Sequence, residues 1–369
     1  MKFWKFYLLA ALFVGVSCGT DDSTEPDTTT NDNFDRGAML VHWADNIIIP
    51  AYTSFEVQTS LFDEAVTQFN ISPSINELTL LRQRWIEAYK SFQKVSMFEI
   101  GKAETLNYRN RLNVYPTNTQ EIQGFITEGI WNFELPSTID AQGFPAIDYM
   151  LNGLGTDEEI IVHYTTNSNA DGYKTYLKSL SQTIKNLTSQ VLTDWNTSFR
   201  DTYVSNTSSS ASGAVDQTVN AYIFYYEKGL RAGKIGIPAG VFSSNPLPEN
   251  VEALYKSDIS KLLLEEALQA TRNFFNGNGT TTGPSLKAYL DALNVVKNGS
   301  DLSTLINNQF ATASNQIETL SNNFVEQITQ DNPQMTTTFD ELQRNVILIK
   351  VDMLQALSIN VNYVDADGD

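Results

Sequence analysis

The chain has 369 residues, with 24 lysines and arginines against 43 aspartates and glutamates, for a formal net charge of −19 at pH 7. So negative a charge argues against a nucleic-acid partner, because lysine and arginine contacts to phosphates dominate that kind of binding. The single cysteine excludes disulfide bonds within the chain. The length is sufficient for a large hydrophobic core and is typical of two domains.

The first eighteen residues have the pattern of a bacterial lipoprotein signal. Lys2 and Lys5 precede a mostly apolar run, residues 6–16, which is shorter than the roughly 20 residues that a membrane-spanning helix needs. Small residues and then Cys18 follow, and this stretch resembles a lipobox. We therefore predict a signal peptide over residues 1–17, diacylation of Cys18, and attachment through that lipid to a membrane of the cell envelope, the outer membrane. The alternative is an ordinary signal peptide with an incidental cysteine.

Residues 18–36 are rich in acidic residues and threonine and contain almost nothing apolar. Such a segment cannot bury enough surface to offset the entropy lost on ordering, so we predict a disordered acidic tether. Acidic residues soon after the lipidated cysteine also resemble the export signals of Bacteroidota surface lipoproteins. Both faces of the outer membrane, periplasmic and external, stay open.

From residue 38 onward the apolar side chains are spaced for helices. They recur every three or four residues and so form single stripes in three long segments, residues 78–95, 173–195 and 339–356. Strand-like alternation is scarce. The sequence predicts an all-α protein of about ten helices in two packed bundles, with a joint at the serine-rich residues 205–212. The predicted bundles are residues 37–205 and 206–369.

Local signals predict where helices begin and where they are interrupted. Capping-box spacing marks two helix starts, Ser74 with Glu77 and Asn118 with Glu121, and Pro284 with Ser285 introduces another helix. Pro50 is expected to kink or divide the helical stretch around it. Residues 229–248, rich in glycine and proline, are predicted to form an ordered loop or a bridge.

Six short segments resemble segments of a known family and follow one another in the same order. They are residues 46–52, 84–85, 98–101, 142–151, 231–242 and 363–369. Taken together they resemble the imelysin-like family, and specifically its Bacteroidota lipoprotein branch. The resemblance spans residues 38–369. It implies an all-α fold of two helical bundles, a location in the bacterial envelope and an association with iron uptake. Some members of the family are described as metallopeptidases, whereas many have no demonstrated catalysis.

The family's Gly-x-His-x-x-Glu motif falls on residues 143–148, where this sequence has Gly143, Pro145 and Asp148. In the family pattern an imidazole and a carboxylate three residues apart share one helix face and hold a divalent ion. Proline cannot ligate a metal, so the nitrogen donor is lost. We interpret the segment mainly as a helix start, with Pro145 near the first helical position and Asp148 in the first turn. Asp148 is kept as a candidate ligand for a divalent or iron cation.

Two further groups of residues are candidates for binding. Glu99, at the end of a predicted helix, is a second candidate oxygen ligand for a metal, with an exposed carboxylate as the alternative. Arg231, Lys234 and Gly236 place two cations beside a glycine-rich backbone, which predicts an anion pocket. Under the alternative, the two cations lie at the negative end of a helix that Gly233 terminates.

The two histidines offer little catalytic chemistry. His42 and Asp45 have the spacing of a shared helix face, and we expect a surface or partly buried pair there; His163 has no partner at ligand spacing. The acidic chain end, residues 365–369, imitates the start of a calcium loop but lacks its bidentate glutamate. There is no His-Glu-x-x-His motif and no Ser-His-Asp order. We therefore predict a non-catalytic ligand- or metal-binding envelope protein associated with iron uptake; the alternative is a metal-dependent peptidase of imelysin type.

Overall fold

Helices account for almost all of the regular structure of this computed structural model, which describes residues 34–363. The predicted signal peptide, the lipidated Cys18, most of the tether and the acidic chain end lie outside the described residues. Asp35 accepts the backbone N–H of Ala38 at 2.8 Å and begins the first helix at Arg36. Phe34 stacks on Tyr289 with ring centroids 4.4 Å apart, so the end of the predicted tether already belongs to the folded body.

The elements of the first half are helical throughout. In chain order they are α1 (Arg36–His42), η1 (Trp43–Ile48), α2 (Ile49–Ile71), α3 (Ile75–Gln93), α4 (Lys102–Thr105), α5 (Tyr108–Leu112), α6 (Thr119–Glu128), η2 (Pro136–Ala141), α7 (Gly143–Asn152), α8 (Asp157–Thr165), α9 (Ala170–Asp194), η3 (Trp195–Phe199) and α10 (Arg200–Ser205).

The second half adds one short hairpin to further helices. Its elements are α11 (Ala214–Phe224), η4 (Tyr225–Gly236), η5 (Pro248–Asn250), η6 (Leu254–Ile259), α12 (Ser260–Asn276), α13 (Leu286–Ala292), β1 (Val296–Lys297), β2 (Ser300–Asp301), α14 (Leu302–Glu318), α15 (Phe324–Val346), η7 (Ile347–Met353) and α16 (Leu354–Leu357).

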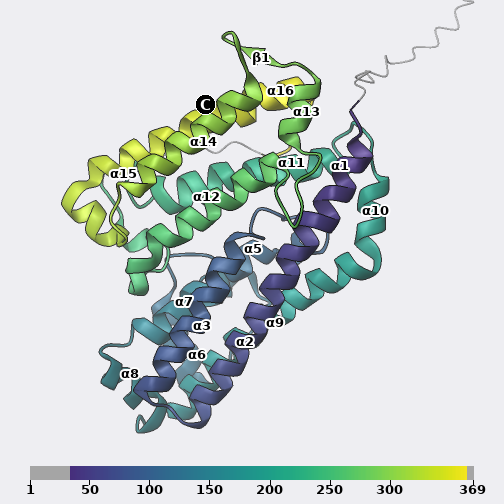
Figure 1. Cartoon of the computed structure of the whole chain (residues 1–369). Helices are drawn as coiled ribbons and strands as arrows, with labels where there is room; N and C mark the ends of the chain where they lie inside the picture. Colours follow the sequence, from purple (N-terminus) through teal and green to yellow (C-terminus); the bar gives the residue numbers. More distant parts are fainter. Residues whose placement is uncertain (1–33, 364–369) are drawn as a thin grey trace, which may run out of the picture. The chain divides into compact units, whose positions relative to one another are not determined.

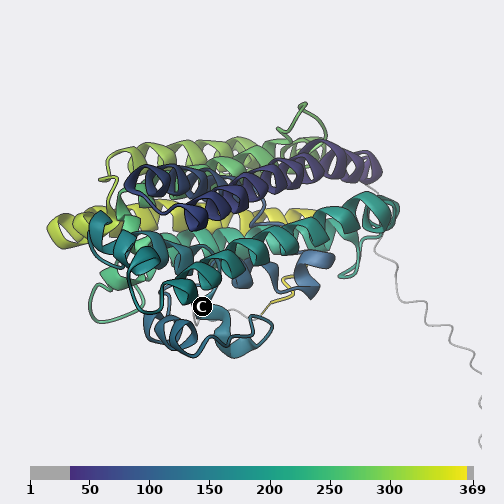
Figure 2. The ribbon, with the colours of Figure 1, turned by 90° about the horizontal axis from the view of Figure 1, so that it is seen from below.

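The helices pack as two groups. In one, α2 lies against both α3 and α9; in the other, α15 lies against α14 and η4, and α12 contacts α14 (Figure 1). Seen from below, the long helices of both groups run in similar directions (Figure 2). Contacts between α3 and α12 join the groups, and the described residues form one compact unit. The predicted all-α class is confirmed, whereas a domain boundary near residue 205 stays a prediction.

The predicted helix starts agree with the structure. The Ser74 hydroxyl accepts the backbone N–H of Glu77 and the Asn118 side chain accepts that of Glu121, while Ser285 caps α13 through Ala288. These short polar side chains satisfy backbone donors that have no partner inside the helix. The apolar stripes lie on the buried faces of α3, of α9, and of α15 with the η7 segment that continues it.

Two interruptions differ from expectation. Pro50 does not divide its helix: it lies at the start of α2, and the π-helical η1 immediately before it carries the chain through with helical dihedrals. Residues 229–236 are not a loop but the second part of the π-helical η4, and only the residues after Gly236 turn. The wider backbone ring of a π-helix accommodates irregularities that would break an α-helix.

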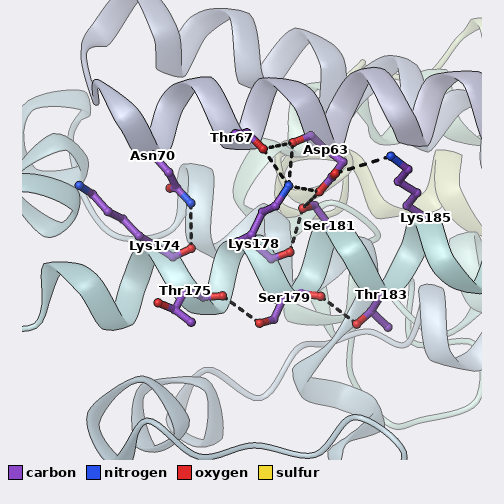
Figure 3. Close-up of polar contacts among 10 residues, drawn as sticks. All are labelled: Asp63, Thr67, Asn70, Lys174, Thr175, Lys178, Ser179, Ser181, Thr183 and Lys185. Atoms are coloured by element: carbon purple, nitrogen blue, oxygen red, sulfur yellow. Dashed lines mark hydrogen bonds and ion pairs between the residues drawn. The ribbon is translucent and has the colours of Figure 1, made fainter.

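A buried carboxylate connects the two longest helices of the first group (Figure 3). The Asp63 carboxylate of α2 accepts hydrogen bonds from the Lys178 ammonium at 2.6 Å and from the Ser181 hydroxyl at 2.7 Å, both in α9. The Lys185 ammonium, also in α9, lies 3.8 Å from the same carboxylate. Lys178 also donates to the Thr67 hydroxyl at 2.8 Å. These contacts fix the register of α2 against α9. In the part of the chain described, no helix combines the length and apolarity that crossing a membrane requires.

Candidate functional site

The residues of the family motif form the buried beginning of α7. Gly143 has a φ of +76°, and a Cβ there would lie 2.2 Å from the carbonyl oxygen of Leu112. Glycine is therefore needed both for its left-handed backbone and for the close approach of α5. Pro145 is buried within the first turn, where its missing N–H costs no hydrogen bond.

Asp148 faces inward and is already engaged by the protein. Its Oδ2 accepts the backbone N–H of Tyr255 at 2.8 Å, and its Oδ1 accepts the Asn152 amide at 3.0 Å. Burial raises the pKa of the Asp148 carboxyl to about 7, although these hydrogen bonds act in the opposite direction. Asp148 also lies beyond the first turn of α7, so the expected stabilisation of its charge by the helix N-terminus is wrong.

The side chains around Asp148 do not form a set of ligands for a divalent cation. A metal site needs several converging carboxylate, imidazole or thiolate groups. Both Asp148 oxygens accept hydrogen bonds from nitrogen donors, and Pro145 stands where the family pattern has its imidazole. Nowhere between residues 34 and 363 do three such side chains gather closely enough to hold an ion.

Glu99 is largely buried and not the exposed carboxylate of the alternative reading. Its Oε2 accepts the backbone N–H of Arg109 at 3.0 Å, next to the start of α5. Burial raises the pKa of Glu99, while the neighbouring Arg109 opposes that rise. Glu99 and Asp148 have different partners and do not contact each other among the described residues, so these two predicted ligands do not form one site.

Arg231 is buried inside η4, not at a helix end. Its guanidinium donates to the Gln343 side chain and to the carbonyl oxygen of Glu227 at 3.3 Å. It lies over the Phe339 ring at 5.0 Å and over the Phe242 ring at 5.9 Å. The same rings occupy the space beside Gly236, where a Cβ would meet each of them within 3 Å. Gly236 is thus a packing position beneath aromatic rings.

Lys234 is paired with a buried carboxylate. Its ammonium donates to Glu252 and, at 2.9 Å, to the Gln93 side chain. Burial lowers the pKa of Lys234, whereas Glu252 acts to raise it. Asn113 donates to the other Glu252 oxygen at 2.8 Å. Of the alternative role, the termination of the helix at Gly233 is wrong, because η4 continues to Gly236 with Arg231 inside it, whereas Lys234 does lie in the last turn of η4.

A cavity of about 310 Å³ opens beside Lys234, between the segment 109–115 and η4. Arg109, Lys228 and Lys234 line it, together with asparagine, tyrosine and phenylalanine side chains. Arg231 and Gly236, the other two residues of the predicted anion pocket, do not line it. The sequence predicted Lys234 as a binding residue, and Lys234 forms part of one wall. Arg109 comes from a distant segment, and no local pattern in the sequence predicted that it would line the same cavity.

The histidines lie apart from this cavity. His42 is buried and its Nε2 lies 2.8 Å from the carbonyl oxygen of Gly277. Asp45, its expected partner, forms an ion pair with Arg200 at 2.6 Å instead, so the predicted pair is wrong. His163 packs on the Tyr173 ring, and its Nδ1 lies 3.4 Å from the Asn167 amide.

Known proteins share this helical architecture and its sequence pattern. The family model described as Peptidase_M75: Imelysin matches residues 48–348. An imelysin-like protein from Psychrobacter arcticum 273-4 has a similar crystal structure, with a TM-score of 0.70 at 17% sequence identity, covering 90% of this chain and 99% of that chain. A Parabacteroides distasonis ATCC 8503 protein described as an iron-regulated protein A precursor gives 0.69 at 18%, covering 86% of this chain and 95% of that chain.

At these identities the structural likeness shows the fold alone. A search of curated protein sequences gives no match. The family model, however, covers most of the chain. The protein therefore belongs to the imelysin family, as the resemblance in its sequence predicts.

Proposed function

We propose that this protein is a lipid-anchored, non-catalytic binding protein of the bacterial envelope that works in iron uptake. The observation that carries the non-catalytic part is the state of Asp148. Its two oxygens accept hydrogen bonds from Tyr255 and Asn152, and Pro145 replaces the imidazole of the family motif. Peptide hydrolysis by a metal-bound water needs about three protein ligands and a base, which these residues do not supply.

The setting in iron uptake is supported by the family and by one structural neighbour. The Parabacteroides protein with the same fold is described as iron-regulated. Iron limitation of the source cells should raise the amount of this protein, whereas zinc limitation should leave it unchanged. An unchanged level under iron limitation would contradict the setting.

The envelope anchor is supported by the lipobox-like stretch before Cys18. Growth with labelled palmitate should label the natural protein and leave Cys18→Ala unlabelled. The variant should also leave the membrane fraction. A natural protein without label would contradict the anchor.

The non-catalytic reading is tested by metal analysis of the purified protein together with a hydrolysis assay on unfolded casein. We expect far less than one metal per chain, no change in metal content for Asp148→Asn, and no hydrolysis that a chelator stops. Stoichiometric metal that Asp148→Asn abolishes would overturn the rejection of a metal site. Chelator-sensitive hydrolysis, absent in Asp148→Asn, would establish the alternative, a metal-dependent peptidase.

A further inference from the structure

We propose that the cavity between α5 and η4 binds a small organic anion, whose carboxylate contacts Arg109 and Lys228 and whose planar apolar body lies against aromatic side chains. The inference deepens the proposed binding role by naming a site and a ligand class. It rests on the proposed function only in that the site binds and does not hydrolyse.

The charged side chains that line the cavity are all cationic. Three cationic residues, Arg109, Lys228 and Lys234, line the cavity, and its described lining contains no aspartate or glutamate. This is the reverse of the whole chain, where acidic residues outnumber basic ones by 43 to 24. A cleft lined by one sign of charge and bounded by protein of low dielectric concentrates ions of the opposite sign.

Two of the three lining cations, Lys228 and Lys234, contact carboxylates behind the wall. Glu227 lies 3.3 Å from Lys228, but the same carboxylate also contacts Lys350 at 2.9 Å and Arg231 at 3.8 Å. Lys228 is therefore held beside the cavity by a carboxylate that also contacts two other cations. Lys234 forms a direct, buried ion pair with Glu252, so it adds little net positive charge to the cavity wall.

Arg109 supplies a guanidinium with remaining donor capacity. It donates to the carbonyl oxygen of Ser96 at 3.3 Å and lies over the Phe224 ring at 5.0 Å. Within the described residues it contacts no carboxylate through its guanidinium, since Glu99 accepts from its backbone N–H. A planar guanidinium held on an aromatic face is well placed for a carboxylate, because its donors match the two oxygens.

The other walls favour an apolar body on the ligand. Phe92, Val114, Phe224 and Ile237 line the same cavity. Tyr115 lines it as well, and within residues 34–363 its hydroxyl makes no hydrogen bond. A volume of about 310 Å³ is near the small end of ligand pockets, which suits a compact molecule with one charged group. Bare inorganic phosphate would leave the aromatic walls without a partner.

The test is calorimetric titration of the full-length protein, purified in detergent, with benzoate, its neutral analogue benzamide, and inorganic phosphate. We expect benzoate to bind, benzamide to bind at least about tenfold more weakly, and phosphate to bind more weakly than benzoate. No benzoate binding at millimolar concentration, or equal binding of benzamide, would overturn the inference. Tighter binding of phosphate would overturn the assignment of the apolar walls.

Three variants locate the binding. Lys228→Gln and Arg109→Gln should each weaken benzoate binding about tenfold, because each removes a charge-assisted contact. Gly233→Ala narrows the cavity, since its Cβ would lie 3.2 Å from the Tyr115 hydroxyl, and it should also weaken binding. Lys287→Gln, which breaks an exposed pair with Asp291, is the matched control and should bind as the natural protein does. Equal affinity in all four variants would place the ligand elsewhere.

These measurements separate the inference from the proposed function. A protein that binds no anion and hydrolyses no casein contradicts only the cavity assignment. A protein that binds benzoate and also hydrolyses casein in a chelator-sensitive manner contradicts only the non-catalytic role.

Discussion

The backbone N–H of Tyr255 donates to Asp148 Oδ2 over 2.8 Å and so ties η6 to α7. The residue that the family pattern offers as a metal ligand is here a buried connection between distant segments. Its second oxygen is held by Asn152 in the same helix. Because this carboxyl is buried, its contribution to the stability of the folded protein depends on pH.

Burial raises the pKa of Asp148 from its ordinary value of 3.8 to about 7 in the folded protein. A raised pKa means that the folded state holds the proton more tightly than the unfolded chain. Stability from this group is therefore complete below pH 4 and is lost as the pH rises towards 7. Asp148→Asn should lack this loss and gain on the order of 3 kcal/mol relative to the natural protein between pH 5 and pH 8. Denaturant unfolding at both values measures it, with exposed Asp258→Asn as the control. An equal difference at both pH values would sink the prediction.

The buried ion pair of Lys234 with Glu252 predicts strong coupling. Lys234→Met leaves the Glu252 carboxylate buried without its cation and should lower the free energy of unfolding by about 3–5 kcal/mol. Adding Glu252→Gln should recover much of this loss. Lys256→Met, which breaks an exposed pair with Asp258, should cost at most about 1 kcal/mol. Denaturant unfolding of the four proteins checks it, and a double variant that is less stable than Lys234→Met would argue against the coupling.

The contact of Asp63 with Lys178 and Ser181 holds α2 against α9 (Figure 3). Asp63→Ala should destabilise the protein by about 2–4 kcal/mol, because the half-buried Lys178 ammonium and the buried Ser181 hydroxyl both lose their acceptor. Thr183→Ala is the control, since that hydroxyl donates only within α9, to the carbonyl oxygen of Ser179. Its effect should stay below about 1 kcal/mol. Thermal unfolding compares the two, and equal effects would show that the contact between the helices contributes nothing.

We expect replacement by alanine to have opposite effects on stability at Gly143 and at Gly124. At Gly143 the new Cβ would lie 2.2 Å from a backbone oxygen of Leu112, so Gly143→Ala should cost about 3 kcal/mol or more. At Gly124, inside α6, nothing lies within 4 Å, and alanine should stabilise by about 0.5–1 kcal/mol. Melting temperatures measure both, and a tolerated Gly143→Ala would contradict the close approach of α5 to α7.

The helices and their starts were predictable because their causes are local. The stripe in α3 and the Ser74 cap depend on residues a few positions apart, and the structure contains both. The prediction of a loop or bridge for residues 229–236 was wrong because the cause of their helical structure is not local. Their glycines look like loop formers, but Gly236 lies beneath the Phe242 and Phe339 rings, and tertiary packing keeps the segment helical.

The candidate site was predictable only in part. The sequence identified Lys234 as a cation in an unusual setting, and the structure places it on the wall of a cavity. It did not indicate Glu252, 18 positions further along the chain, as the partner of Lys234, because the turns after η4 must fold before the two meet. Nor did it indicate Arg109 as the opposite wall, because that residue comes from a segment more than a hundred positions away. His42 and Asp45 share a helix face, yet each has a distant partner instead.

Residue order alone thus determined the all-α class, the family and the loss of the motif histidine, because periodicity and motif identity are properties of the chain itself. Whether a carboxylate is free to bind or already engaged was decided by the tertiary structure. Asp148 is engaged by Tyr255, and Glu227 is shared among three cations. Burial and long-range hydrogen bonds set the charge state and the availability of such groups, and neither exists before the helices pack.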